Sequence, residues 1–307
     1  MTQSEQDLLH GLIIKAQSGL FEVETEEGII TSRLRGRLTQ GRREGDAAAI
    51  GDRVQVRRLE DGSGSIEEIE ERERVLSRQS PGRPDQEQVL VANPDQALFV
   101  FACADPDPNF RMLDRFLVVA EREDIPALIV ANKLDLVVGR SARSEFDPYE
   151  DLGYPVLYTS AETGKGVNKL RKVLRDKISV FAGPSGVGKT SLLNAVQPGL
   201  GLRTREMSQA TGRGKHTTVA PKLITLDFGG YVADTPGLKA LALWDIEPEE
   251  LDAYFPEMRE LVADCAFSDC THVHEPGCAV IHAVENGGIA PERYDSYLRM
   301  RSGEDDR

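Results

Sequence analysis

The 307-residue sequence contains few aromatic residues, four cysteines and no long apolar run. Because no stretch approaches the length of about eighteen apolar residues that a membrane helix needs, we expect no membrane span. The N-terminal residues are polar and acidic, without the basic start and apolar core of a signal peptide, so we expect a cytoplasmic location. Basic residues are outnumbered, and the net charge of −14 argues against a general nucleic-acid coat protein while permitting a local basic site.

A glycine-rich loop lies between an apolar strand and a helix in the second half of the chain. The strand leads into Gly-x-x-x-x-Gly-Lys-Thr, the pattern of a phosphate-binding P-loop, whose backbone N–H groups and helix N-terminus attract phosphate. We expect Lys189 to reach the β- and γ-phosphates and to act in catalysis, and the Thr190 hydroxyl to bind Mg²⁺. The residues expected to bind nucleotide here are Gly183, Pro184, Ser185, Gly186, Val187, Gly188, Lys189, Thr190 and Ser191.

Two continuous apolar runs, 96–102 and 125–131, predict strands buried on both faces of a parallel sheet. The second ends in Asn132, Lys133, Leu134 and Asp135, the Asn-Lys-x-Asp motif with which GTPases bind guanine. The carboxylate of Asp135 can accept from guanine N1–H and from the exocyclic amine, a donor pair that adenine lacks. Asn132 can bond the other edge of the base and connect neighbouring loops, and the stem of Lys133 can lie along the base.

A further strand ends in Ser160 and Ala161, a dipeptide that can support guanine through a backbone N–H. With a P-loop in the same chain, the guanine motif predicts that the nucleotide is GTP.

Two further segments have the properties of nucleotide-sensing switches. Residues 203–218 are polar and glycine-rich, and we expect Thr218 to complete the Mg²⁺ shell while the γ-phosphate is present. A predicted β-hairpin then delivers Asp-x-x-Gly, with Asp234 facing Mg²⁺ and the Gly237 N–H facing the γ-phosphate. In ordinary GTPases the guanine motif follows the P-loop, whereas here Asn132 precedes Gly183, which indicates a circular permutation.

The N-terminal segment contains about five short β-type runs separated by glycines, which predicts a small barrel resembling an OB-fold. Eight arginines and three acidic residues between Arg33 and Arg58 give it a basic surface. This surface either contacts an RNA backbone or is a solvated loop with charged strand faces. Residues 166–177 predict an amphipathic helix whose outer face carries Lys169, Arg171, Lys172, Arg175 and Lys177. Such a face is usually only solvated, and contact with RNA or another partner is the alternative.

The C-terminal segment concentrates three cysteines within fourteen residues. Cys265, Cys270, His272 and Cys278 match a structural Zn²⁺ site with no open position, so no chemistry on the metal is expected. The spacing is not that of a common zinc finger, which leaves a chance cluster of reduced cysteines as an alternative, and His274 and His282 remain alternatives to His272. A segment this small and polar needs a metal to fold.

Together these motifs resemble the circularly permuted GTPases of the RsgA type, and the resemblance covers essentially the whole chain. It implies an OB-like domain at 1–75, a permuted α/β P-loop GTPase domain at 76–240 and a mostly helical zinc-binding domain at 241–307. By the match, the zinc ligands are Cys265, Cys270, His272 and Cys278. His216 is the family's candidate for positioning the attacking water. Leu238, where other GTPases have a water-orienting glutamine, fits slow intrinsic hydrolysis.

The resemblance also implies a monomeric, cytoplasmic factor that binds the rRNA and ribosomal proteins of the small ribosomal subunit, with no DNA or membrane partner. Such a factor acts late in maturation of the subunit, which stimulates its hydrolysis of GTP to GDP and phosphate. The alternatives are a GTPase switch acting on a non-ribosomal protein or membrane partner, and a scaffold that binds GTP with little hydrolysis. Activation without ribosomal subunits would indicate the first, and tight GTP binding without stimulated turnover would indicate the second.

Overall fold

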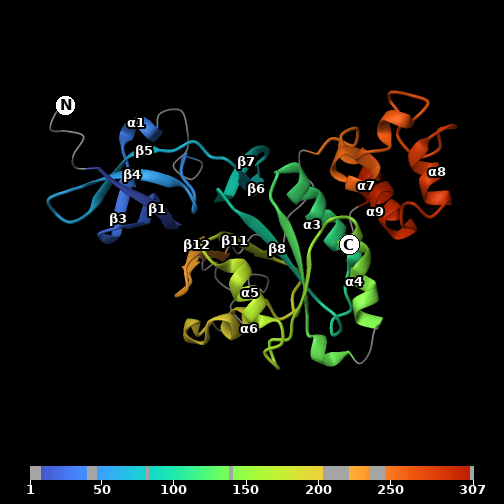
Figure 1. The fold of residues 1–307 in the computed structure, drawn as a ribbon. Helices are drawn as coiled ribbons and strands as arrows, with labels where there is room; N and C mark the ends of the chain where they lie inside the picture. The colour runs from blue at the N-terminus through green and yellow to red at the C-terminus, as the bar shows by residue number, and fades with distance from the viewer. Residues whose placement is uncertain are drawn as a thin grey trace.

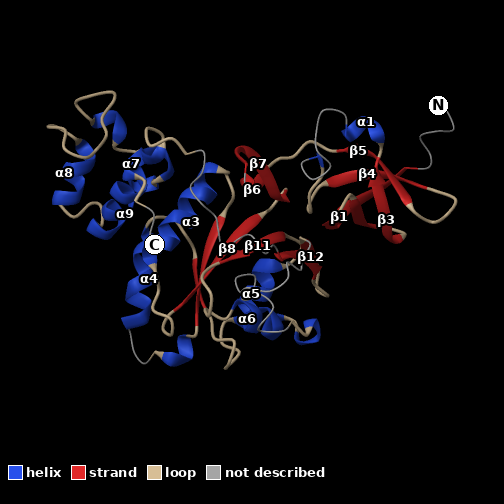
Figure 2. Ribbon diagram, turned by 180° about the vertical axis from the view of Figure 1, so that it is seen from behind, coloured by secondary structure: helices blue, strands red, loops and turns tan. Residues whose placement is uncertain are grey.

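The computed structural model describes residues 8–39, 47–80, 83–137, 141–202, 221–234 and 246–304. An N-terminal β-barrel, a central α/β domain and a mostly helical C-terminal module follow one another across the molecule (Figures 1 and 2). The predicted fold class is therefore confirmed. Within the described ranges, no helix has the length and apolar character needed to cross a membrane.

Five short strands form the barrel because their apolar residues alternate with polar ones and so point to one side. β1 pairs with both β2 and β4, β2 pairs with β3, β3 pairs with β5, and β5 pairs with β4, which closes the barrel. Buried Ile13, Val23, Val54 and Ile66 fill its centre. Its elements are β1 (Leu8–Gln17), β2 (Leu20–Thr25), β3 (Gly28–Leu34), α1 (Gly36–Thr39), β4 (Arg53–Arg58) and β5 (Gly64–Ile69).

A two-stranded ribbon, β6 (Val75–Ser80) and β7 (Arg83–Ala92), connects the barrel to the central domain. At its base, the Asn93 side chain accepts from the Glu73 N–H (2.9 Å) and donates to the Gly51 carbonyl (3.1 Å). The fully buried carboxylate of Asp52 accepts two hydrogen bonds from Arg72, at 2.7 and 2.8 Å. These contacts attach the barrel to the start of the central domain.

The central sheet has the strand order β10-β9-β8-β11-β13-β12, with every strand parallel to its neighbour except β12. β12 also pairs with β1 at Lys222 and Lys15, so the sheet continues into the barrel. The strands are β8 (Gln96–Ala102), β9 (Ala127–Asn132), β10 (Val156–Tyr158), β11 (Ile178–Ala182), β12 (Lys222–Thr225) and β13 (Tyr231–Asp234).

Helices cover both faces of this sheet, which explains the continuous apolar runs in its strands. Phe99 and Phe101 of β8 belong to the core beneath α3, whereas Leu98 and Val100 belong to the core beneath α5 and α6 (Figure 1). Asn109 caps α3, where its side chain accepts from the backbone N–H three residues later. The helical elements are α3 (Phe110–Arg122), η1 (Leu134–Leu136), α4 (Ser141–Asp151), α5 (Val167–Leu174), α6 (Lys189–Val196) and η2 (Pro198–Leu200).

The C-terminal module packs on α3, on the side of the central domain away from the barrel (Figure 1). Its core of Phe255, Met258 and Tyr297 extends to Val118 of α3. The module consists of η4 (Leu251–Tyr254), α7 (Pro256–Arg259), η5 (Val262–Asp264), α8 (Ala279–Glu285) and α9 (Pro291–Ser302).

Candidate nucleotide and metal sites

The P-loop lies between β11 and α6, and its backbone can be built only with glycine at two positions. Gly183 has a φ of +145°, and a Cβ atom on it would lie 2.1 Å from the Val100 carbonyl oxygen. Gly188 has a φ of +90°, and a Cβ atom there would lie 2.6 Å from the Asn132 amide nitrogen. The close approach brings the loop against β8 and β9 while its tip, at Ser185 and Gly186, stays exposed.

The hydroxyl and ammonium groups expected to bind phosphate and metal sit at the start of α6. The Lys189 ammonium donates to the carbonyls of Gly183 (2.6 Å) and Pro184 (2.7 Å), so it lies across the mouth of the loop. Thr190 is buried, whereas Ser191 is exposed. Backbone N–H groups at a helix N-terminus with an adjacent ammonium form an anion site suited to phosphates.

Asn132 connects the P-loop to the guanine-binding loops. Its side chain is 1% exposed; the amide donates to the Val187 carbonyl (2.9 Å), and its oxygen accepts from the Thr159 hydroxyl (3.1 Å). Both ends of this amide therefore hold protein segments together, which is the connecting role expected for it.

Asp135 and Ser160 lie together where a guanine edge would be read. The buried Ser160 hydroxyl donates to the Asp135 carboxylate, which fixes the orientation of that carboxylate. The Ser160 N–H donates to the Lys165 carbonyl (2.9 Å), whereas the Ala161 N–H has no acceptor within the described residues. Of the two amides in this dipeptide, that of Ala161 is therefore the one available to a base.

Lys133 adopts a left-handed backbone conformation with a φ of +61° between β9 and η1. Its ammonium donates to the Asp105 carbonyl and lies 3.9 Å from the Asp105 carboxylate. Asp105 belongs to no motif in the sequence. Its contact with Lys133 depends on the fold, which brings the loop after β8 beside the loop after β9.

Asp234 ends β13, which runs parallel to the P-loop strand β11 with Ala233 opposite Val180. The backbone of Asp234 is therefore at the same end of the sheet as the P-loop. Its side chain, and the predicted roles of His216, Thr218 and Gly237, lie outside the described residues.

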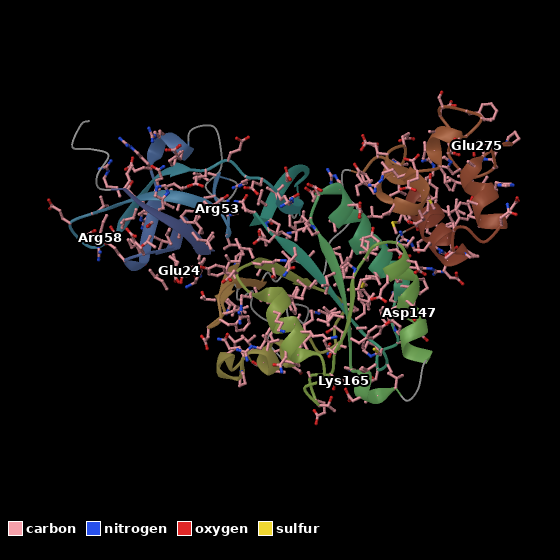
Figure 3. The ribbon with its side chains drawn as sticks, viewed as in Figure 1. Glu24, Arg53, Arg58, Asp147, Lys165 and Glu275 are labelled. Atoms are coloured by element: carbon pink, nitrogen blue, oxygen red, sulfur yellow. The ribbon has the colours of Figure 1, made fainter. Side chains whose placement is uncertain are left out.

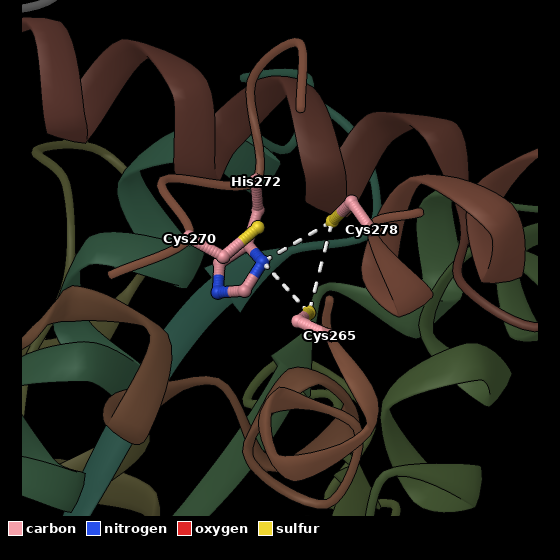
Figure 4. A group of neighbouring side chains, drawn as sticks. All are labelled: Cys265, Cys270, His272 and Cys278. Carbon is pink, nitrogen blue, oxygen red and sulfur yellow. Dashed lines mark hydrogen bonds between the residues drawn. The ribbon is translucent and has the colours of Figure 1, made fainter. Parts of the chain in front are cut away.

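In the C-terminal module, Cys265, Cys270, His272 and Cys278 bring three sulfurs and one ring nitrogen within 4.8 Å of one another (Figure 4). The Cys265 and Cys278 sulfurs are 3.9 Å apart, close to the edge of about 3.8 Å expected for a tetrahedron of zinc–sulfur bonds. His272 Nδ1 lies 3.3 Å from the Cys278 sulfur and 3.6 Å from the Cys265 sulfur. The donor set, its geometry and its closed coordination fit a structural Zn²⁺ ion, with His272 rather than His274 or His282 in the cluster.

A carboxylate orients the histidine of this cluster. His272 is fully buried, and its Nε2 lies 3.1 Å from an Asp252 carboxylate oxygen. An N–H at Nε2 leaves Nδ1 with its lone pair toward the sulfurs, the arrangement that carboxylates commonly impose on metal-binding histidines. No local pattern marks Asp252 as a partner of His272, because it lies twenty residues away among other acidic residues.

The loop that carries His272 is fixed from the other side by α9 and by a neighbouring glutamate. Tyr294 and Tyr297 donate to the carbonyls of His272 (2.6 Å) and Thr271 (2.9 Å). Glu275 accepts from the side chain and N–H of Thr271 and from the N–H groups of the next loop residues. The hydrogen bond from the Thr271 hydroxyl is the largest cause that holds the Glu275 pKa below its usual range.

Four of the eight arginines behind the basic surface predicted on the barrel contact neighbouring carboxylates. Arg35 and Arg57 contact the buried carboxylate of Glu67. At the two ends of β4, Arg58 lies 2.7 Å from Glu27 and Arg53 lies 3.6 Å from Glu73. The arginine count of this segment therefore overstates the positive charge that its surface presents.

Comparisons with known proteins cover almost the whole chain. The family model described as RsgA GTPase matches residues 69–244, and the RsgA N-terminal domain matches residues 10–66. The small ribosomal subunit biogenesis GTPase RsgA of Gemmatimonas aurantiaca is 45% identical over 95% of this chain and 96% of that protein. The protein of the same name from Moorella thermoacetica is 44% identical over 94% of this chain and 95% of its own length.

Solved structures show the same architecture. The crystal structure of YjeQ from Thermotoga maritima aligns with a TM-score of 0.80 at 41% identity, covering 96% of this chain and 98% of that one. YloQ, titled a circularly permuted GTPase, aligns with a TM-score of 0.76 at 34% identity, covering 100% of this chain and 99% of its own.

Proposed function

This chain belongs to the RsgA family of circularly permuted GTPases, and from that premise we propose that it binds the small ribosomal subunit and acts late in its maturation. As a GTPase it hydrolyses GTP to GDP and phosphate, and we propose that the subunit stimulates this hydrolysis. The observation that carries the proposal is the near-complete coverage of the chain by relatives that bear the subunit-biogenesis name.

Nucleotide recognition follows from the loops that Asn132 joins. The P-loop N–H groups and the Lys189 ammonium hold the β- and γ-phosphates, while Asp135, oriented by Ser160, accepts from the two guanine donors. Because Asn132 bonds both to the P-loop and to Thr159, the phosphate and base contacts belong to one connected site. In this proposal Thr190, Thr218 and Asp234 would hold Mg²⁺, which would neutralise charge on the phosphates during hydrolysis.

In this proposal the switch segments convert the state of the nucleotide into binding to the subunit. Thr218 completes the Mg²⁺ shell while the γ-phosphate is present, the Gly237 N–H contacts the γ-phosphate, and both interactions are lost after hydrolysis. His216 helps to position the attacking water. Leu238 offers no hydrogen-bonding group for that purpose, which fits slow hydrolysis until the subunit completes the geometry.

The proposal also assigns the three domains, the zinc ion and the cellular location. Residues 1–75, 76–240 and 241–307 act as barrel, GTPase and zinc-binding domains. Cys265, Cys270, His272 and Cys278 hold one structural Zn²⁺ ion, which stabilises the C-terminal module and takes no part in hydrolysis. The protein works as a cytoplasmic monomer on ribosomal RNA and ribosomal proteins, without a DNA or membrane partner.

The test is phosphate release from GTP with and without purified small ribosomal subunits, with Lys189→Ala as the blank and large subunits as the control. Stimulation by small subunits alone is expected. If GTP binds but small subunits leave turnover unchanged, the proposed function is wrong, and a protein-directed switch or a scaffold takes its place.

Nucleotide choice is tested separately with Asp135→Asn. The variant offers an amide donor where guanine also offers donors, so GTP affinity is expected to fall while affinity for xanthosine triphosphate rises. Unchanged GTP affinity would contradict the role of Asp135.

A further inference from the structure

The most positive segment of the central domain is α5 with its flanking residues. Residues 165–177 contain six basic residues and one acidic residue, in a chain whose net charge is −14. We define the α5 surface as the exposed side chains of Lys165, Lys169, Lys172 and Arg175. Val167, Leu170 and Leu174 on the opposite side of the helix are buried, so these charges are carried on an anchored element.

The basic side chains of the α5 surface have no carboxylate partners among the described residues, unlike the paired arginines of the barrel. Among the described residues, no carboxylate lies within 4.0 Å of the ammonium or guanidinium groups of the α5 surface, whereas the barrel arginines described above contact glutamates. The nearby acidic residue Asp176 is directed toward the turn at Gly229. On α5, an incoming anion would therefore meet cations without carboxylate partners in the described part of the chain, but at Arg35, Arg53, Arg57 and Arg58 of the barrel it would have to displace carboxylates.

Helix stability does not explain this arrangement. Basic residues near a helix C-terminus are favourable, which accounts for Lys172 and Arg175. Lys165 and Lys169 lie at the N-terminal end, where the macrodipole disfavours cations, and the first turn of α5 contains no acidic residue. Lys169 and Lys172, three residues apart, also repel each other. Helix stability therefore leaves Lys165 and Lys169 unexplained, whereas an external anionic partner would account for them.

The α5 surface extends between the guanine loop and the barrel. At one end, the Lys165 carbonyl accepts from the Ser160 N–H of the guanine site. At the other, the Lys177 carbonyl accepts from the Tyr231 N–H, and the Tyr231 hydroxyl donates to Glu24 of the barrel. Figure 3 shows Lys165 at the lower edge of the central domain and Glu24 at the barrel boundary, both away from the C-terminal module.

We propose that the α5 surface binds the phosphate backbone of RNA, as part of the interface with the small ribosomal subunit. This inference rests on the proposed function, which supplies the RNA. A lipid surface fits less well, because the apolar side chains of α5 are buried and none projects among the basic residues to enter a membrane.

The experiment measures binding of the full-length protein to purified small ribosomal subunits with a non-hydrolysable GTP analogue, between 50 and 200 mM salt. For Lys169→Gln/Lys172→Gln, we expect about tenfold weaker binding at low salt and a log–log salt slope smaller by about 1.4–1.8, the effect of losing two phosphate contacts. GTP hydrolysis without subunits should stay unchanged, because neither residue belongs to the nucleotide site.

Two matched variants isolate the effect of the α5 charges. Lys169→Arg/Lys172→Arg keeps both charges and should bind like the wild type. Arg53→Gln/Arg58→Gln removes two charges from the barrel and should reduce the slope less, because both arginines already contact glutamates. Thermal melting checks that all variants are folded.

Each outcome separates this inference from the function on which it rests. If the wild type binds subunits with a steep salt dependence and the Lys169→Gln/Lys172→Gln variant binds equally well, the α5 proposal is wrong and the proposed function stands. If the wild type does not bind subunits at all, the proposed function fails and the α5 proposal fails with it. Binding instead to phosphatidylserine-containing vesicles, lost in the same variant, would assign the surface to a membrane and overturn the RNA proposal.

Discussion

Arg293 of α9 holds the C-terminal module on the GTPase domain through a buried charge network. Its guanidinium lies 2.7 Å from Asp114 of α3 and binds Glu257 of α7 at 2.7 and 3.2 Å. Asp114 also accepts from Tyr149 (2.8 Å) and Ser296 (2.5 Å). Burial alone would lower the pKa of Arg293, but the charges of the two carboxylates raise it above its ordinary value.

Replacing Arg293 by methionine would keep much of the apolar volume but leave two carboxylates buried without their cation. The side chains of Arg293, Asp114 and Glu257 are 5%, 2% and 7% exposed, so water cannot replace the lost contacts. Removing one partner of a buried ion pair typically costs about 3–5 kcal/mol. Arg299→Met on the same helix is the control, because Arg299 is 37% exposed and pairs with Asp295 at the surface, where a pair contributes at most about 1 kcal/mol.

Urea unfolding, followed by far-UV circular dichroism and by the fluorescence of Trp244, the single tryptophan, measures the difference. For Arg293→Met we expect a midpoint lower by at least about 1 M, from a loss of about 3 kcal/mol and a slope of about 3 kcal/mol per molar urea. Arg299→Met should leave the midpoint nearly unchanged. Equal midpoints for the two variants would refute the claim that the buried network attaches the module.

Three further predictions address the metal site, the P-loop and alkaline stability. Asp252→Asn should weaken zinc binding about 10–100-fold in competition with a chromophoric chelator, while His274→Ala leaves it unchanged; equal affinities would contradict the orienting role of the carboxylate. Gly183→Ala should abolish GTP binding in equilibrium dialysis because its Cβ meets the β8 backbone, and Gly199→Ala, with open space around it, should bind normally; binding by both would show that the loop can shift. Burial and a neighbouring carboxylate raise the pKa of Tyr149, so its contribution to stability is complete below about pH 10 and is lost as the pH rises, at about 1.4 kcal/mol per pH unit. With Tyr149→Phe, the free energy of unfolding measured in urea between pH 9.5 and 11 should fall less steeply with pH. An unchanged dependence on pH would show that ionisation of Tyr149 does not cause the decline.

The sequence best predicted the elements that short, local residue patterns determine. The run 96–102 is a strand with every residue buried, because helices cover both faces of the sheet. The P-loop and the Asn-Lys-x-Asp segment also follow from short patterns, since each needs only a strand end and a turn. The hairpin β12–β13 formed where turn residues separated two β-type runs.

Features that depend on contacts distant in sequence could not be predicted. Arg293 and Asp114 are 179 residues apart, and no local pattern marks either as a partner of the other. Spacing alone left His272, His274 and His282 open; the family resemblance selected His272, but nothing in the sequence indicated its contact with Asp252. The α4 helix contains Pro148 and has only a weak apolar pattern, and it was not predicted.

Charge counting along the sequence was also a poor guide to the exposed electrostatic surface. The barrel segment carries more arginines than α5, yet Glu27, Glu67 and Glu73 arrive from other parts of the chain to pair with them. The lysines of α5 receive no such partner among the described residues. The fold therefore pairs four of the barrel arginines with carboxylates and leaves the α5 lysines without such partners among the described residues.

Circular permutation makes β13 the last strand of the GTPase domain. The end of β13 is therefore connected directly to the C-terminal module. β13 is held beside the P-loop strand β11, with Ala233 opposite Val180. The chain then continues through residues 235–245, which include Gly237 of the Asp-x-x-Gly motif, to a module that Arg293 fixes on α3. A movement of the end of β13 relative to α3 would therefore be opposed at one end by the sheet and at the other by a buried ion pair. It follows that the C-terminal module moves together with α3, unless the Arg293 network is broken first.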